Sequence, residues 1–282
     1  MRIAVVQMDV ALGEIEANLT RMLERVEESR RHGADLTIFP ECALTGYCFD
    51  GLAETRPFAQ SIPGPATERF RERLKQLGGA VVFGMIEKHG EGIFNAAVLV
   101  TGEGVQASYR KIHLPYLGID QFATYGDRPF SVAEYEGVRL GLCICYDSAF
   151  PESMRSLMLQ EADVFVLPTN FPSGADVMTD FVLRTRALEN KVYFACSNRI
   201  GDERGWRFIG QSQIIDPSGQ WIAKAAGEEE TILYADIDVE LARNKRVGRS
   251  SIVQALDRVA DRRPEFYDLL TVPHNHPRPG RD

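Results

Sequence analysis

A glutamate, a lysine and a cysteine each close an apolar run that is expected to be a β-strand: Glu41, Lys111 and Cys145. Taken singly, each has an ordinary explanation. A strand-end lysine can extend to water, a glutamate after a proline can cap a helix, and a free cysteine can be a small buried side chain. Taken together, three strands would deliver an ammonium, a carboxylate and a thiol to one edge of a sheet. Those groups are the ones needed to cleave an acyl C–N bond.

The three side chains have complementary duties in such a reaction. A free thiol is only slightly ionised near neutral pH, so a nucleophilic Cys145 needs an adjacent base. Glu41 would take its proton and later return it to the departing amine. Lys111, with the backbone N–H that follows the cysteine, would stabilise the tetrahedral oxyanion, and one such donor contributes about 3 kcal/mol.

The strand that ends near Cys145 has one face of small residues. With a period of two, Gly141, Cys143 and Cys145 share this face, which leaves room for a substrate. We expect Cys143, Cys42 and Cys196 to be inert core residues. The pair Cys143 and Cys145 could alternatively be half of a metal site, but no second pair or nearby histidine completes it, so we expect no zinc. The proposed cleavage by a thiol also requires no metal or organic cofactor.

The elements that must position these residues alternate between strands and helices. Apolar residues spaced three and four apart predict helices at 15–31, after Pro151, at 66–77 and at 178–190. Strands are expected at the amino terminus and at 34–41, 80–86, 94–100, 105–111, 139–146, 164–167, 192–197, 208–215, 220–225 and 231–237. So many strands in an α/β chain favour two sheets with helices on their outer faces, a four-layer α-β-β-α sandwich.

Two segments of the chain resemble one another. Residues 34–41 (ADLTIFPE) and 162–169 (ADVFVLPT) each follow an expected helix and end in proline plus a polar residue. This echo would suit a pseudo-symmetric fold, although short buried parallel strands also look alike in general. Because proline cannot donate to a strand ladder, both strands are expected to stop there.

The composition limits the class of protein. Of the 282 residues, 44% are hydrophobic, which is enough for one large core, and 32 Lys and Arg against 40 Asp and Glu give a net charge of −8. A phosphate backbone requires a basic surplus, so we expect no nucleic-acid partner. No apolar run approaches the roughly 20 residues that span a bilayer, so we expect no membrane partner.

The cysteines and the first residues indicate the compartment. The five cysteines are odd in number and lack paired C-x-x-C spacing, which is typical of a reducing environment. The segment from Met1 to Asp9 has too short an apolar run for a signal peptide and is expected to begin directly as a strand. We therefore expect a soluble, cytoplasmic protein.

Segments spread over most of the chain carry a family resemblance. They are Pro40-Glu41, Leu44-Thr45-Gly46-Tyr47, Tyr109-Arg110-Lys111-Ile112-His113-Leu114, Cys145-Tyr146-Asp147, Phe150-Pro151-Glu152, Pro168-Thr169-Asn170, Arg186-Ala187-Leu188-Glu189-Asn190, Asn198-Arg199-Ile200-Gly201 and Asp216-Pro217-Ser218-Gly219. In this set the chain resembles the nitrilase superfamily, the carbon-nitrogen hydrolases, whose members use a Glu-Lys-Cys triad on an α-β-β-α sandwich and need no cofactor.

The resemblance assigns roles to individual residues. It implies Glu41 as general base and acid, Lys111 as oxyanion stabiliser and Cys145 as nucleophile. Family members typically carry a second glutamate in the loop after the lysine, and this position falls on Asp120, one methylene shorter. Apart from the resemblance, the loops that adjoin the three strands offer Tyr47, Tyr116, Tyr146, Asn170 and Phe171 as candidates for the substrate pocket, although the aromatic residues could equally belong to the core.

The residues after the cysteine favour one branch of the superfamily. Nitrilases commonly follow the cysteine with Trp-Glu, whereas Cys145-Tyr146-Asp147 resembles the amidase-like and Nit-like branches. We therefore expect hydrolysis of a small-molecule amide, with an N-carbamoyl amide or a nitrile as alternative substrates and a catalytically silent regulatory member as a further alternative. Ala149 stands where many Nit-like and omega-amidase sequences have arginine. This difference weakens the inference that the substrate is an α-keto acid amide, as in omega-amidases.

The domain organisation is expected to be simple. Residues 1–262 should form the carbon-nitrogen hydrolase domain, and residues 263–282, with four prolines, should form an extended carboxy-terminal arm. The resemblance also implies a homodimer or a higher homo-oligomer, in which two sandwiches pair and the arm could reach across.

Overall fold

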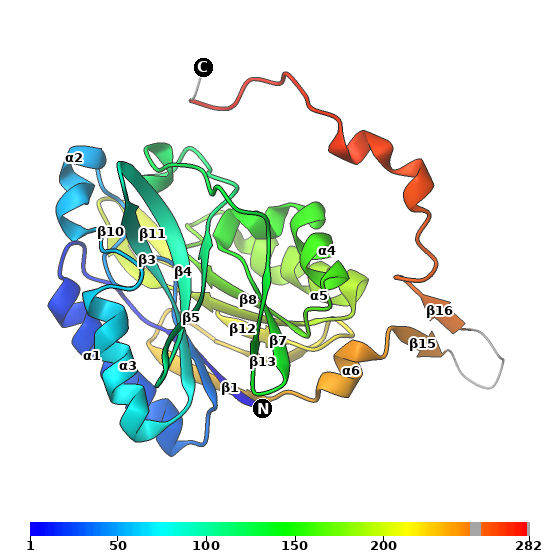
Figure 1. The fold of residues 1–282 in the computed structure, drawn as a ribbon, viewed down its shortest axis with the longest axis horizontal. Helices are drawn as coiled ribbons and strands as arrows, with labels where there is room; N and C mark the ends of the chain where they lie inside the picture. Colours follow the sequence, from blue (N-terminus) through cyan, green and yellow to red (C-terminus); the bar gives the residue numbers. More distant parts are fainter. Residues whose placement is uncertain (249–254, 281–282) are drawn as a thin grey trace.

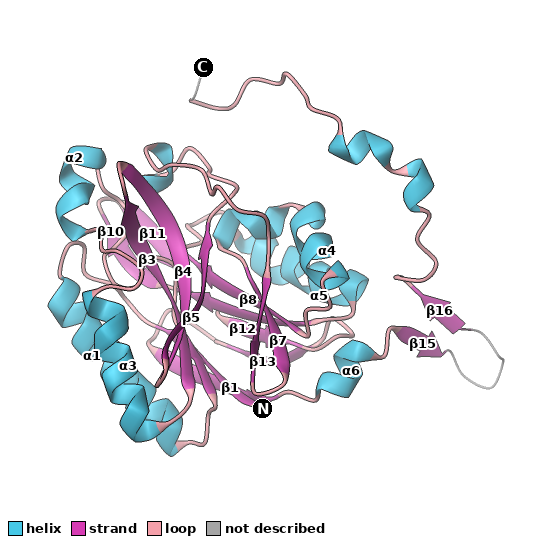
Figure 2. Ribbon diagram, viewed as in Figure 1, coloured by secondary structure: helices cyan, strands magenta, loops and turns pink. Residues whose placement is uncertain are grey.

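Two six-stranded sheets pack against each other and helices cover their outer faces (Figures 1 and 2). The computed structural model describes residues 1–248 and 255–280. Across the first sheet the order is β14 (Thr231–Asp236), β1 (Arg2–Gln7), β2 (Leu36–Ile38), β3 (Ala80–His89), β4 (Gly92–Thr101) and β5 (Gly104–Arg110). Across the second it is β13 (Trp221–Lys224), β12 (Gln213–Ile215), β9 (Tyr193–Asn198), β8 (Val164–Thr169), β7 (Val138–Leu142) and β6 (Val132–Tyr135). The predicted four-layer α-β-β-α sandwich is confirmed.

The helices lie between successive parallel strands. They are α1 (Ile15–Arg31), α3 (Pro65–Leu77), α4 (Pro151–Leu159) and α5 (Leu183–Asn190), with the shorter α2 (Leu52–Thr55) and α6 (Val239–Arg243) outside this pattern. A π-helical turn, Met178–Val182, leads directly into α5, so the helix predicted at 178–190 has two parts. Figure 1 shows α1 and α3 on one side of the sandwich and α4 and α5 on the other.

The core has separate layers because strand side chains alternate between the two faces of a sheet. Ile3 and Val5 of β1 belong to the cluster between the sheets, whereas Val6 packs under the helices with Leu19 of α1 and Phe70 of α3. All five side chains are at most 2% exposed. Burial of one such side chain contributes about 1.5–3 kcal/mol, so both layers hold the sheets rigidly in place.

The two sheets repeat one topology. In each, three parallel strands (β1, β2, β3 and β7, β8, β9) are connected through helices, and antiparallel strands flank them. The two similar segments of the sequence form β2 and β8. Strand β2 is third in its sheet, counted from β14, and β8 is third in the other sheet, counted from β6. The sequence echo therefore corresponds to a structural pseudo-symmetry.

Besides β2 and β7, which are shorter than the strands expected at 34–41 and 139–146, two of the expected strands differ from the prediction. The single strand expected at 208–215 is two strands, because Gly210 (φ 61°) and Gln211 (φ 57°) take left-handed backbone conformations that interrupt it. Its first part joins a separate hairpin of β10 (Ile200–Glu203) and β11 (Trp206–Ile209). The other is β8, which was expected to stop at Pro168 but continues to Thr169. The proline is tolerated because the neighbouring strand β7 has already ended at this point, so no carbonyl of β7 lacks a donor.

After α6 the chain leaves the sandwich. It forms an antiparallel pair of short strands, β15 (Arg246–Gly248) and β16 (Ala255–Asp257), and two 3-10 turns, Pro264–Phe266 and Asp268–Thr271. Figure 1 shows this segment outside the body, and near its end Arg278 stacks over the Tyr125 ring at 4.9 Å. Within the described ranges, no helix has the length and apolarity to cross a membrane.

Candidate active site

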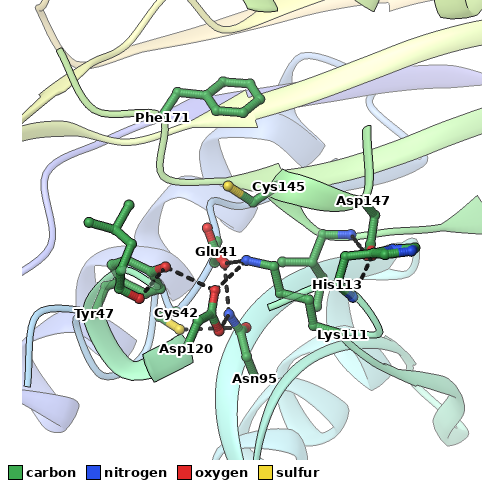
Figure 3. A network of polar contacts seen from close by, with 12 residues as sticks. Glu41, Cys42, Tyr47, Asn95, Lys111, His113, Asp120, Cys145, Asp147 and Phe171 are labelled. Carbon is green, nitrogen blue, oxygen red and sulfur yellow. Dashed lines mark hydrogen bonds and ion pairs between the residues drawn. The ribbon is translucent and has the colours of Figure 1, made fainter. Parts of the chain in front are cut away.

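The segments that follow β2, β5 and β7 bring the predicted residues together. Lys111 comes directly after β5, while Glu41 and Cys145 each lie three residues beyond the last residue of their strands. The prediction of strand-end positions therefore holds for Lys111 alone. Glu41, Lys111 and Asp120 are at most 1% exposed and Cys145 is 7% exposed. Figure 3 shows the four side chains around one point between the sheets.

A buried ion cluster lies on one side of this point. Lys111 Nζ is 2.7 Å from Glu41 Oε1 and 2.5 Å from Asp120 Oδ2. Asn95, in β4, donates from Nδ2 to Glu41 Oε1 at 2.7 Å and to Asp120 Oδ1 at 2.9 Å. The ammonium and the amide therefore bridge the same two carboxylates and fix their separation.

Asp120 is also held from a third direction. The Tyr47 hydroxyl lies 2.9 Å from Asp120 Oδ2 and 3.0 Å from the carbonyl oxygen of Leu117, and it can donate to one of them at a time. Asp120 itself belongs to a short 3-10 turn, Gly118–Gln121, which places a side chain as short as aspartate within reach of the lysine. The loss of one methylene relative to glutamate is thus compatible with a full set of contacts.

The protonation states follow from burial and from the neighbouring charges. Burial alone would lower the pKa of Lys111, but the carboxylates of Asp120 and Glu41 outweigh it and raise that pKa well above its usual value. Burial raises the pKa of Glu41, Asp120 raises it further, and Lys111 and Asn95 oppose the rise. The result is a permanently charged lysine beside a carboxylate that is more basic than an ordinary glutamate.

Cys145 lies at a backbone turn and is not part of a strand. The strand β7 stops at Leu142, and Cys145 begins a 3-10 turn, Cys145–Ala149, with a φ of 44°. The alternation expected to place Cys145 on one face with Gly141 therefore does not reach it. A left-handed conformation is rare for a residue with a side chain and is kept only where its surroundings enforce it. Here it directs the thiol away from the ladder and toward the ion cluster (Figure 3).

The thiol is neutral in the resting protein. Burial and the nearby Glu41 raise the pKa of Cys145 to about 12, while Lys111, the Thr169 hydroxyl and the Asn170 backbone N–H oppose the rise. The nucleophile must therefore lose its proton during attack, and the adjacent base is part of the arrangement.

Several polar groups around the thiol are left open. Among the described residues, Glu41 Oε2 has no hydrogen-bond partner, and neither does the side-chain amide of Asn170, which is 1% exposed. The Lys111 ammonium has three N–H groups, and its acceptors among the described residues are the carboxylates of Glu41 and Asp120. A buried polar group without a partner is destabilising, so such a set next to a nucleophile is typical of a site that a polar ligand completes.

Comparison with known proteins agrees with this geometry. Residues 2–247 match the profile of the carbon-nitrogen hydrolase family, which covers most of the chain. The chain belongs to the carbon-nitrogen hydrolase family. It is 37% identical to a nitrilase from Pyrococcus abyssi (95% of this chain, 99% of the relative) and 32% identical to an (R)-stereoselective amidase from a Pseudomonas species (85% and 86%).

A solved structure of similar fold is the NitN amidase from Nesterenkonia sp. AN1. It superimposes on this carbon-nitrogen hydrolase with a TM-score of 0.81 at 26% identity, over 96% of this chain and 99% of that one. Another structure of that amidase, a glutamate-to-glutamine mutant, shows the acetamide moiety of fluoroacetamide added covalently to its active-site cysteine, at a TM-score of 0.78, 26% identity and 95% coverage of each chain.

The residues predicted for substrate binding in this carbon-nitrogen hydrolase lie in three places. Asn170 and Phe171 follow β8, and Figure 3 shows Phe171 on the far side of Cys145 from the ion cluster. Tyr116 and Tyr146 are exposed and line a cavity of about 1000 Å³ beside the loop after Lys111. Tyr47 is buried, and its hydroxyl contacts Asp120 and the Leu117 carbonyl. Its position therefore indicates that it holds Asp120 in place.

Sequence reasoning missed some residues of the site. Asn95 is one, and its only signal is a polar amide within the apolar strand 92–101. Thr169 is another, and its proximity to Cys145 depends on β8 continuing past Pro168. For metals, no grouping of three His, Cys, Asp or Glu side chains that could hold an ion occurs in the described ranges.

Proposed function

We propose that this carbon-nitrogen hydrolase cleaves the C–N bond of a small amide through a thioester on Cys145. The observation that carries the proposal is the open ion cluster: a buried carboxylate with one oxygen that lacks a partner among the described residues, and a buried ammonium that pairs with two carboxylates, both next to a neutral thiol. The acetamide moiety added to the cysteine of the Nesterenkonia amidase supports a nucleophilic cysteine at this place.

Attack begins with a proton transfer. Glu41 Oε2 takes the thiol proton as the sulfur bonds to the amide carbon, and the carbonyl electron pair moves onto oxygen. The third Lys111 N–H and the backbone N–H of Tyr146 stabilise this oxyanion, since the first N–H groups of a helical turn have no partner within it. The C–N bond then breaks, and the proton on Glu41 goes to the leaving nitrogen.

Hydrolysis of the thioester repeats the proton transfers with water. Glu41 accepts a proton from the attacking water, a second oxyanion forms at the same donors, and the C–S bond breaks with the proton returned to sulfur. Ammonia or an amine and a carboxylate are the products. In this scheme Asp120 takes no proton; it holds the lysine and keeps it charged.

The acyl group would lie between Phe171 and the open groups. The Asn170 amide, which has no partner among the described residues, supplies two N–H donors and an acceptor oxygen for a polar group of the substrate, and Tyr146 and Tyr116 would contact its outer part. Nitrile hydrolysis is the second candidate, because the relative from Pyrococcus abyssi is named a nitrilase.

One assay separates these possibilities. Ammonia release is measured for purified protein over aliphatic amides, omega-amides, N-carbamoyl compounds and nitriles, with Cys145→Ala as the matched control. We expect turnover of amides by the native chain and none by the variant, with equal Tm values. Activity confined to nitriles would overturn the amide assignment, and a native chain that turns over no compound and forms no adduct would indicate a silent binding protein.

We also propose that the protein is a homodimer in the cytoplasm, with residues 1–262 as the catalytic domain and 263–282 as an arm that crosses to the partner. Exposed apolar side chains support the pairing; they lie on α4, α5 and the arm, at Leu159, Leu188, Phe266, Leu269, Leu270 and Val272. All five cysteines are unpaired, which suits a reducing compartment. Light scattering of the full chain and of a chain ending at Arg263 tests the arm: a dimer is expected for the first and a weaker one for the second, whereas two monomers would contradict the proposal.

A further inference from the structure

A second buried carboxylate, Asp147, lies two residues after Cys145 and takes no part in the mechanism above. It is fully buried, and its two oxygens accept four hydrogen bonds. Oδ1 accepts from the His113 backbone N–H at 3.2 Å and from His113 Nδ1 at 2.8 Å. Oδ2 accepts from the Tyr109 hydroxyl at 2.8 Å and from the Ile144 backbone N–H at 2.9 Å.

The four donors surround the two halves of the active site. Tyr109 and His113 lie two residues before and two residues after Lys111, on the first sheet and the loop that follows it. Ile144 immediately precedes Cys145 on the second sheet's side. One carboxylate therefore connects the backbone that carries the ammonium to the backbone that carries the thiol, across the interface between the sheets (Figure 3).

The same contacts hold the unusual turn at Cys145. Asp147 accepts from Ile144 N through its side chain and donates its own N–H to the Ile144 carbonyl at 3.0 Å, while the Ser148 hydroxyl donates to the Cys145 carbonyl at 2.7 Å. The left-handed conformation of Cys145 is thus fixed from both sides.

The partners of Asp147 are themselves held in place. The Tyr109 hydroxyl accepts the Ile112 N–H at 3.2 Å while it donates to Asp147. The His113 ring stacks on Phe150 with centroids 3.9 Å apart, and its bond to the carboxylate makes Nδ1 the donor nitrogen. The connection is a closed network of charge-assisted hydrogen bonds, which are shorter and stronger than neutral ones.

We propose that Asp147 is a positioning residue for amide hydrolysis: by tying Tyr109 and His113 to Ile144, it sets the distance and orientation between the Lys111 ammonium and the Cys145 sulfur. It touches no reacting atom. This inference rests on the proposed function, since it concerns the alignment of the same nucleophile and oxyanion donor.

The test measures kcat and KM for Asp147→Asn and Tyr109→Phe, each normalised to active sites titrated with a thiol-alkylating reagent. A misplacement of about 1 Å at reacting groups lowers rates by about 10²-fold. We expect kcat to fall by about 10²-fold in Asp147→Asn and by about 10-fold in Tyr109→Phe, with KM within about threefold of the native value. The double variant should lose little more than Asp147→Asn alone, because both changes break one network.

Tyr193→Phe is the matched control, because its hydroxyl contacts the Asp238 N–H near the start of α6 and no residue of the site. It should keep the native kcat. If Asp147→Asn does not fold, Tyr109→Phe decides the question alone. A native kcat per titrated site in Tyr109→Phe, or a raised KM with kcat unchanged, would overturn the positioning role. Failure of the proposed function itself is distinct, since the native chain would then turn over no amide.

Discussion

Two consecutive residues, Arg110 and Lys111, project into two buried ion clusters of different character. Arg110 donates from Nε and Nη2 to the two oxygens of Glu87, at 2.8 and 2.6 Å, and from Nη1 to Asp127 at 2.8 Å. Its guanidinium also stacks over the Phe94 ring at 4.0 Å. Every nitrogen of the guanidinium is engaged, so this cluster is closed.

The cluster around Lys111 is more deeply buried, because its three charged side chains are all fully buried whereas the Asp127 side chain is 52% exposed, and it is also open. Glu41 keeps one oxygen without a partner among the described residues, and the lysine pairs with two carboxylates through only two of its three N–H groups. Strand alternation explains the separation, since Arg110 and Lys111 face opposite ways, as do Phe94 and Asn95 on the neighbouring strand. The comparison teaches that the incomplete set of hydrogen bonds distinguishes the reactive cluster, because both clusters contain a buried pair of opposite charges.

Glu41→Gln should have the largest effect on activity. The amide keeps an oxygen for Lys111 and Asn95 but cannot take a proton, so we expect turnover to fall by at least about 10³-fold, as the general base acts in both half-reactions. Ammonia release at saturating amide measures this. An activity loss below about tenfold would contradict the assignment of Glu41 as base.

The same substitution should not destabilise the fold at neutral pH. Burial raises the pKa of Glu41 above 4.5, so the folded state favours the protonated carboxyl group. The native protein therefore loses folding stability as pH rises through this raised pKa, because the buried group must ionise. Thermal unfolding of Glu41→Gln and native protein should coincide at low pH, with the variant equal or higher at pH 7.

Lys111→Met should rank second. It removes the oxyanion donor, worth about 10²–10³-fold in kcat, and leaves Glu41 and Asp120 without their shared cation. Breaking a buried pair in this way costs about 3–5 kcal/mol, so denaturant unfolding should show lower stability as well. A variant with native kcat would contradict the role of the ammonium.

Glu87→Gln makes the same chemical change as Glu41→Gln in the closed cluster. It removes the buried one of the two carboxylates that pair with Arg110 and leaves the half-exposed Asp127, so we expect a loss of unfolding free energy of about 3–5 kcal/mol with kcat within about threefold of native. Denaturant titration measures the expected loss of unfolding free energy, and kcat per folded molecule measures the expected retention of activity. A loss of kcat comparable to that of Glu41→Gln would remove the distinction between the clusters.

The pH profile should show the smallest but most specific effect. Activity needs ionised Glu41 and protonated Cys145, so the acid limb of kcat/KM should lie above the ordinary glutamate value of 4.5. An ordinary thiol titrates near 9, but the pKa of Cys145 is raised to about 12, so we expect no change attributable to the thiol near pH 9. A limb with a pKa near 9 in kcat/KM, matched by the same pKa in the rate of Cys145 alkylation, would contradict a neutral resting thiol.

The sequence predicted local features best. The helix at 15–31 has the predicted bounds, because its apolar spacing depends on neighbours in the chain alone. The turn at Cys145 was not predicted, since it depends on Asp147 and through it on Tyr109 and His113 of the other sheet. Asn95 was missed for the same reason, as its contacts with Glu41 and Asp120 join residues far apart in the chain.

The central claim is that Cys145 carries the acyl group during turnover. Rapid acid quench of the native protein with a turned-over amide, followed by intact mass and peptide mapping, tests it directly. The account predicts a mass increase equal to the acyl group, located on the peptide that contains Cys145 and absent in Cys145→Ala. Steady turnover with no adduct under pre-steady-state sampling, or an adduct on another residue, would contradict it.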